Sequence, residues 1–306
     1  MMININRRRF GIIFRSIFNA YLLRSHGFAL YNAENSAPQV INKPKCVEIG
    51  DQRHLYWFTL VGMSDTRTTS STLYPRFAEM FDRNPTLFKI GYIPTEKRVT
   101  ELFRKYRIAL PVKQIKFFIE RKRHLDLIFN GNPLEIYSDV KTIDELMLKL
   151  NHLKKKNGIK NIFPGAKRKV FTLLAMFLSE FAEFDFEEVV PVDVWVQSIA
   201  NSTHALSGEG VIDINKLEQM IRPVLVKVFK NFKHHHGAAS ATWILGNKFC
   251  SNCHRTDVSN NCPVFKLCDG PSLRMRHPES DKHYGRIERP FNPRGKFRKI
   301  TIVSVS

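Results

Sequence analysis

The sequence predicts an all-α protein, and three observations lead to that fold class. Between Gln52 and Val228, apolar residues recur at intervals of three and four positions, the spacing of amphipathic helices. Strand signals are few, and the β-branched run at 189–196 contains Pro191, after which a helix starting near Val192 fits better. The chain has 24 phenylalanines, which favours a packed interior over a disordered basic chain.

The length and the charge of the chain limit the classes of protein to which it can belong. The chain has 306 residues, which suits one large domain or two small ones. It carries 48 lysines and arginines against 28 acidic residues, a net charge of +20, so the expected partner is a polyanion, most simply nucleic acid. A membrane span needs about 18–20 uninterrupted apolar residues. The best run, Phe10 to Leu23, is shorter and contains Arg15, so no membrane partner is expected.

Six further helices are predicted from apolar spacing and start signals: 95–106, 113–129, 142–153, 167–181, 193–200 and 215–232. The second of these carries a basic face, made of Lys113, Lys116, Arg121, Lys122 and Arg123. A basic face of this kind is either solvated or in contact with a DNA backbone, and the net charge of the chain keeps both interpretations open.

The two ends of the chain are basic. Residues 1–33 contain no acidic residue, and the apolar positions between Phe10 and Phe18 have the spacing of an amphipathic helix. Three interpretations stay open for this segment: an organelle presequence, a basic arm on nucleic acid, or residues without a role that an upstream start codon adds. The stretch 35–44 resembles a linker, and 269–306 is expected to be a partly ordered basic tail.

A short turn precedes the helix predicted from residue 167. Phe163 is followed by Pro164, which restricts φ, and Gly165, which permits a tight turn. The free N–H groups at the start of the next helix can then face a phosphate. Positive charge gathers at the same place, on Lys167, Arg168 and Lys169. The alternative is an ordinary turn followed by a solvated basic triplet.

Asp193 is an isolated acid in an apolar stretch, two positions after Pro191. It is either the N-cap of the following helix or a partly desolvated carboxylate held beside a reacting centre.

Four cysteines fall within 19 positions, with the spacing Cys250-x2-Cys253-x8-Cys262-x5-Cys268. Such clustering predicts a metal site in a reducing compartment, because the chain has too few cysteines for a disulfide scaffold. Four thiolates suit either zinc or a [4Fe–4S] cluster. Cys46 lies outside this group and is expected to be a plain buried or linker thiol.

Together these motifs resemble the helix-hairpin-helix DNA glycosylases of the endonuclease III superfamily. The family hairpin, Leu-Pro-Gly-Val-Gly with a catalytic lysine downstream in lyase-active members, matches the segment from Phe163 to Lys169. The family's Val-Asp motif matches Val192-Asp193, and the residues around it are similar to those of the 8-oxoguanine branch of the family. The resemblance therefore implies that Lys169 and Asp193 are catalytic. It also implies DNA contact by the hairpin residues Phe163, Pro164, Gly165, Ala166, Lys167 and Arg168.

The resemblance extends over roughly residues 52–268. Further matching landmarks are Leu60–Ser64 with Thr66, Val99–Phe103, Gly131–Glu135 and Trp243–Gly246. The sequence also departs from the pattern: Lys167 replaces the second hairpin glycine, and the gap between the two catalytic positions is long, with 184–188 as the insertion. The loop after Ser64 has no clear match for the glutamine that often fills the space of a flipped base.

The resemblance implies a two-domain fold. A six-helix barrel with the hairpin is expected at 57–188. A flanking helical domain is expected from 49–56 plus 189–268, with a basic extension at 1–48 and the tail at 269–306. Three of the four cysteines match the family's cluster loop, so the resemblance favours [4Fe–4S] over zinc, in a structural role.

The implied function is a DNA N-glycosylase with AP-lyase activity in base excision repair. Asp193 would stabilise the oxocarbenium-like centre, and the amine of Lys169 would form a Schiff base, which requires a neutral amine, a state that burial favours. The expected partner is double-stranded DNA, bound by a monomer in the cytoplasm or nucleoid of a prokaryote, or in a eukaryotic nucleus or mitochondrion. Two alternatives are a non-catalytic DNA-binding protein with a structural four-cysteine metal site and a zinc-containing RNA-binding protein.

Overall fold

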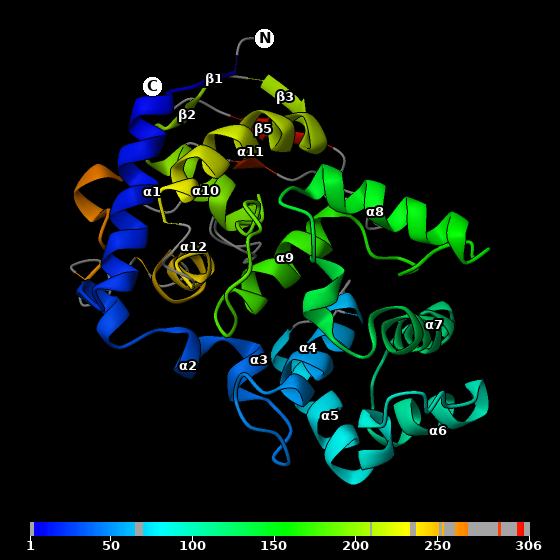
Figure 1. Cartoon of the computed structure of the whole chain (residues 1–306). Coiled ribbons are helices and arrows are strands. Elements are labelled where there is room, and N and C mark those ends of the chain that lie inside the picture. Colours follow the sequence, from blue (N-terminus) through cyan, green and yellow to red (C-terminus); the bar gives the residue numbers. More distant parts are fainter. Residues whose placement is uncertain are drawn as a thin grey trace. The chain divides into compact units, whose positions relative to one another are not determined.

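The computed structural model describes residues 3–64, 70–208, 210–232, 237–250, 253, 261–268, 287–288 and 299–302. Helices account for most of these residues, which confirms the predicted all-α class at that level (Figure 1). The chain divides into two compact units: unit 1 comprises Met1–Ala33 and Val190–Ser306, and unit 2 comprises Glu34–Val189. Among the residues described, no helix combines the length and apolar character that crossing a bilayer requires.

The regular elements in the described part of unit 2 are all helices. Its elements are α2 (Ala33–Ser36, which begins at the boundary), α3 (Pro38–Ile41), α4 (Gln52–Ser64), α5 (Ser70–Arg83), η2 (Pro85–Phe88), α6 (Glu96–Lys105), α7 (Val112–Phe129), η3 (Pro133–Ile136), α8 (Ile143–Lys156) and α9 (Arg168–Leu178). Every residue of α4 from His54 to Ser64 is buried, because α5, α7 and α9 all pack against this helix. The start of α9, where the hairpin ends, is thereby anchored to the centre of the unit.

Unit 1 combines helices with two small sheets. Its elements are β1 (Asn4–Ile5), α1 (Arg7–Leu22), η1 (His26–Ala29), α10 (Val194–Ser202), β2 (Leu206–Ser207), β3 (Gly210–Asp213), α11 (Ile214–Lys230), α12 (Ser240–Ile244), the π-helix η4 (Leu245–Phe249), η6 (Phe265–Leu267), β4 (Ile287–Glu288) and β5 (Lys299–Ile302). β1 pairs antiparallel with β2, and β5 lies between β3 and β4, antiparallel to both. Parts of the predicted tail thus belong to a sheet, and the rest lies outside the described residues.

The N-terminal helix is confirmed as α1, but the expectation that 1–48 is an appended extension is wrong. The apolar stripe of α1 is buried, and Phe18 meets the rings of Phe229 and Phe232 edge-on. The helix packs against α11 and α12. A stripe of this kind cannot remain in water at low cost, so α1 completes the core of unit 1.

The predicted linker and domain boundary also differ from the structure. The stretch 35–44 contains α3, in which Gln39 and Val40 are buried, so this stretch is part of unit 2. Residues 49–56, expected in the flanking domain, belong to unit 2 as well, because α4 begins at Gln52.

Candidate functional site

The segment in which the hairpin is predicted comprises α8, a loop and α9 within unit 2. α8 begins with a capping box in which Thr142 and Glu145 bond each other's backbone N–H groups. The loop ends in the turn at Gly165, which has φ +81°, a conformation that favours glycine. α9 then starts at Arg168, with Lys167 as its N-cap. The sequence expectation of a tight turn followed by a helix is therefore confirmed.

The segment 184–188, which has the position of an insertion, supports the first helix of this hairpin. The backbone N–H of Glu187 donates to the carbonyl of Lys141 at 2.7 Å, and a carboxylate oxygen of Glu188 accepts from the N–H of Ile143 at 3.3 Å. Phe186 is buried against the ring of Tyr137. These contacts hold the segment against the start of α8.

The inner side of the turn is anchored by buried side chains. Phe163 is 4% exposed and stacks on Phe129, with ring centroids 5.5 Å apart. Pro164 is also buried, and its carbonyl accepts from Nε of Arg121 at 2.8 Å. Neither side chain is exposed for the DNA contact that was expected of Phe163 and Pro164. Both residues instead pack beneath the turn and hold it in place.

The outer side of the turn presents donors and positive charge. Gly165, Lys167, Arg168 and Lys169 are exposed, and Ala166 is half-buried. In the part of the chain that the structure describes, the backbone N–H groups of Gly165, Lys167, Arg168 and Lys169 have no protein acceptor. The Arg168 guanidinium is paired with Asp144. The start of α9 therefore offers free N–H groups, the positive end of the helix dipole and two lysines to an anion.

Lys169 is the second residue of α9, and its side chain is exposed. The burial that was expected for this side chain is therefore not found. It belongs to unit 2, whereas Asp193 belongs to unit 1.

Asp193 is the N-cap of α10. Its Oδ1 accepts from the N–H groups of Trp195 at 2.9 Å and Val196 at 3.0 Å, and the residue is half-buried. The N-cap interpretation is confirmed, because two otherwise unsatisfied donors of the first turn bond this carboxylate. A second role at a reacting centre stays a prediction.

α10 is tied to the segment that leads into the cysteines. Trp195 is buried, and its ring lies against Gly246 in η4. A Cβ on Gly246 would come within 2.2 Å of the ring, so only glycine permits this packing. The fixed end of η4 is followed directly by Cys250.

The four predicted ligand cysteines lie in one region of unit 1. Burial raises the pKa of the Cys250 thiol well above its usual range, and the charges of Cys262, Cys268 and Cys253 raise it further. Burial also raises the pKa of Cys262 to about 12 and that of Cys253. Mutual electrostatic effects of this kind require that the thiols are near one another.

The described residues contain no group of three or more cysteine, histidine or acidic side chains arranged to hold a metal ion. The metal site therefore stays a prediction. The donor set itself fits the group: four soft sulfur donors without a carboxylate suit zinc or an iron–sulfur cluster, and a bound cation favours the thiolates that burial alone disfavours.

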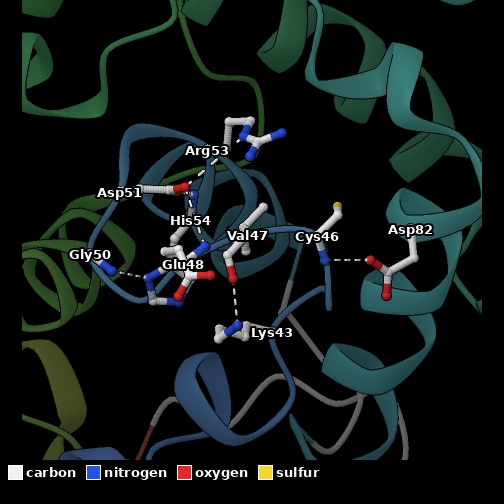
Figure 2. Close-up of polar contacts among 9 residues, drawn as sticks. All are labelled: Lys43, Cys46, Val47, Glu48, Gly50, Asp51, Arg53, His54 and Asp82. Carbon is white, nitrogen blue, oxygen red and sulfur yellow. Dashed lines mark hydrogen bonds and ion pairs between the residues drawn. The ribbon is translucent and has the colours of Figure 1, made fainter.

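Cys46, expected to be a buried or linker thiol, is exposed. Its backbone N–H donates to the carboxylate of Asp82 at 3.1 Å (Figure 2). Partial desolvation and the nearby carboxylate of Asp82 raise the pKa of its thiol, so it stays protonated at neutral pH.

The predicted basic face of α7 is wrong in two of its five members. Arg121 and Lys122 are both fully buried, and neither side chain contacts solvent. Lys122 Nζ donates to the carboxylate of Asp126 and to the hydroxyl of Tyr56, at 2.8 and 2.7 Å. The sequence contains no signal for this, because a basic residue on a helix is usually solvated.

The fold and the site define a mostly helical protein with an exposed, basic helix start after the turn at Gly165 and a group of half-buried cysteines. No family model, curated protein or solved structure matches this chain.

Proposed function

We propose that this protein is a DNA N-glycosylase with AP-lyase activity, which excises a damaged or mismatched base from double-stranded DNA in base excision repair. The observation that carries the proposal is the hairpin, where free N–H groups and Lys169 share the first turn of one helix. The order of hairpin, capping acid and four cysteines along the chain supports it.

Binding would begin at the hairpin. The free N–H groups at the turn and at the start of α9 suit the oxygens of a backbone phosphate, and Lys167 adds positive charge beside them. The net charge of +20 adds a sequence-independent attraction to the duplex. The target base has to leave the stack before it can react.

The chemistry would use one amine and one carboxylate. As the glycosidic bond breaks, its electron pair leaves with the base, and the carboxylate of Asp193 stabilises the positive charge at C1′. The amine of Lys169, after it loses one proton to solvent, attacks C1′. A second proton then passes from its nitrogen to the ring oxygen as the C1′–O4′ bond breaks, which leaves a Schiff base with the opened sugar. The Schiff base then permits β-elimination of the 3′ phosphate.

Cys250, Cys253, Cys262 and Cys268 would hold a [4Fe–4S] cluster, with zinc as the alternative. The bound group would supply a structural cross-link between the end of η4 and the segment that contains η6. No chemical step is assigned to it.

The test is borohydride trapping of the protein on duplexes that carry oxidised, deaminated or mismatched bases. Wild-type protein should form a covalent complex with at least one duplex, and Lys169→Ala should abolish it. Lys155→Ala, an exposed lysine in the last turn of α8, serves as the matched control and should trap normally. Persistent trapping by Lys169→Ala would remove this residue as the nucleophile.

A second candidate is a DNA-binding protein without catalysis, which keeps the hairpin and the four-cysteine site. The exposure of Lys169 and the capping role of Asp193 favour it, since both residues then have ordinary structural explanations. Release of a free base from a modified duplex distinguishes the two functions. A binding protein without catalysis would retard the duplex in an electrophoretic shift assay but release no base.

A further inference from the structure

Among the residues that the structure describes, Arg121 is a buried cation with no ion-pair partner. Its side chain is fully buried, yet no carboxylate in the described part of unit 2 forms an ion pair with it. Burial lowers its pKa to about 10, with a smaller opposing effect from Glu120, so the guanidinium remains charged at neutral pH. Lys122, the next residue, is equally buried but is paired with Asp126. A buried charge is costly when no ion pair compensates it, and none does so within the described residues.

The guanidinium lies directly beneath the hairpin turn. Nε donates to the carbonyl of Pro164 at 2.8 Å, and Nη1 donates to the hydroxyl of Ser64 at 3.3 Å. Nη2 has no acceptor and lies against Gly165, 2.8 Å from the position that a Cβ there would occupy. The ring of Phe117 closes the remaining side, 5.4 Å from the guanidinium carbon.

These contacts set the orientation of one peptide group. The peptide between Pro164 and Gly165 is trans, so its C=O and N–H point in opposite directions. Because Arg121 holds the carbonyl on the buried side, the N–H of Gly165 points away from it. This N–H has no acceptor within the described residues, and Gly165 is exposed.

We propose that Arg121 is a positioning residue for phosphate binding: it fixes the Pro164–Gly165 peptide with the N–H of Gly165 outward, and its charge beneath the turn attracts a phosphodiester oxygen. The phosphate is then bound by the N–H groups of Gly165 and of the first turn of α9, a helix of 11 residues. The inference rests on the proposed nucleic-acid binding, but it does not depend on base excision.

The experiment compares Arg121→Met with Lys122→Met, two neighbouring buried cations on one helix. Duplex affinity is measured at several salt concentrations, and the thermal unfolding midpoint is measured for each variant. Arg121→Met should bind about tenfold more weakly, and the slope of log affinity against log salt should fall by about one, because about one phosphate contact is lost. Lys122→Met should lower the midpoint without changing the slope.

An unchanged slope in Arg121→Met would make Arg121 a structural residue only and overturn the proposal. If Arg121→Met does not fold, Arg121→Lys replaces it: lysine keeps the charge but lacks the planar fork that reaches Pro164 and Ser64 together, so affinity should fall with a smaller loss of slope. Wild-type slope and affinity in Arg121→Lys would contradict the positioning role.

A second experiment uses inorganic phosphate in place of DNA. It should raise the unfolding midpoint of the wild-type protein and raise that of Arg121→Met less. If neither duplex nor inorganic phosphate binds the wild-type protein, the proposal is wrong. Binding that depends on Arg121, together with no release of any base, would instead refute the glycosylase and leave the phosphate site in place.

Discussion

At the scale of single residues, His54 shows how burial determines a protonation state. The backbone N–H of Gly50 donates to Nδ1 of His54 at 3.0 Å (Figure 2). The ring hydrogen is therefore on Nε2, which donates to the carbonyl of Gln39 at 2.8 Å. Both ring nitrogens are thus satisfied only in the neutral form. Burial lowers the pKa of His54 below its usual value of 6.5.

The lowered pKa predicts a loss of stability in acid. Below pH 6.5, His54 binds a proton in the unfolded chain but remains neutral in the folded protein. The free energy of unfolding should therefore fall as the pH falls from about 7 to the pKa of His54 in the folded protein. The loss should be about 1.4 kcal/mol for each unit by which folding lowers that pKa. Urea unfolding at pH 7.5, 6 and 5 measures this. His54→Gln should flatten the dependence, and the exposed His152→Gln should not. Equal slopes in both variants would disprove the assignment.

Asp193 allows its two roles to be separated by substitution. Asparagine caps helices about as well as aspartate, so Asp193→Asn should keep the stability of the wild-type protein, whereas Asp193→Ala should lose about 1 kcal/mol. If the carboxylate also acts at the sugar, Asp193→Asn should strongly reduce base excision while duplex affinity stays within a few fold of wild type. Thermal unfolding and single-turnover excision give the two readouts, and normal excision by Asp193→Asn would leave only the cap.

At the scale of elements, the N-terminal segment of unit 1 braces the region of the cysteines. The guanidinium of Arg9 donates to the carbonyl of Leu267 at 3.4 Å, and the N–H of Gly27 donates to the carbonyl of Asn261 at 2.8 Å. Gly27 also lies against the ring of Phe249, next to Cys250. The N-terminal segment therefore supports the residues that flank the four cysteines.

This packing predicts a difference between two residues of η1. A Cβ at Gly27 would lie 2.0 Å from the Phe249 ring, so Gly27→Val should displace the ring and speed alkylation of the Cys250 thiol. Ala29→Val adds a larger side chain at an exposed position of the same turn and should alkylate at the wild-type rate. Mass spectrometry of time-resolved alkylation measures both, and equal rates would contradict the bracing.

Most helices were predictable because their cause is local. Apolar spacing and capping residues place α6, α7, α8, α10 and α11 within a few positions of their expected ranges. The burial of Arg121 and Lys122 was not predictable, because it depends on which face of α7 meets α4 and the hairpin. The strands β3 and β5 were missed for a similar reason, since their pairing joins residues far apart in the chain.

At the scale of the whole molecule, the group of four half-buried cysteines is the feature that chemical analysis tests most directly. We expect stoichiometric iron and sulfide with a broad visible absorbance band in protein purified without oxygen, and loss of that band in Cys262→Ala. Cys46→Ala, the exposed cysteine outside the group, should retain it. A colourless protein with one zinc per chain would show that the four cysteines bind zinc and not a cluster. A folded protein without metal would show that they form no metal site.

The sequence by itself determined the helical class, the basic character, the turn at Gly165 and the cap at Asp193, because composition, glycine and capping residues act within a few neighbours. The tertiary structure alone decided that α1 belongs to the core, that Phe163 faces inward and that Arg121 is buried beneath the turn. These outcomes depend on packing between distant segments, where each apolar face is removed from water by a partner that local sequence does not specify.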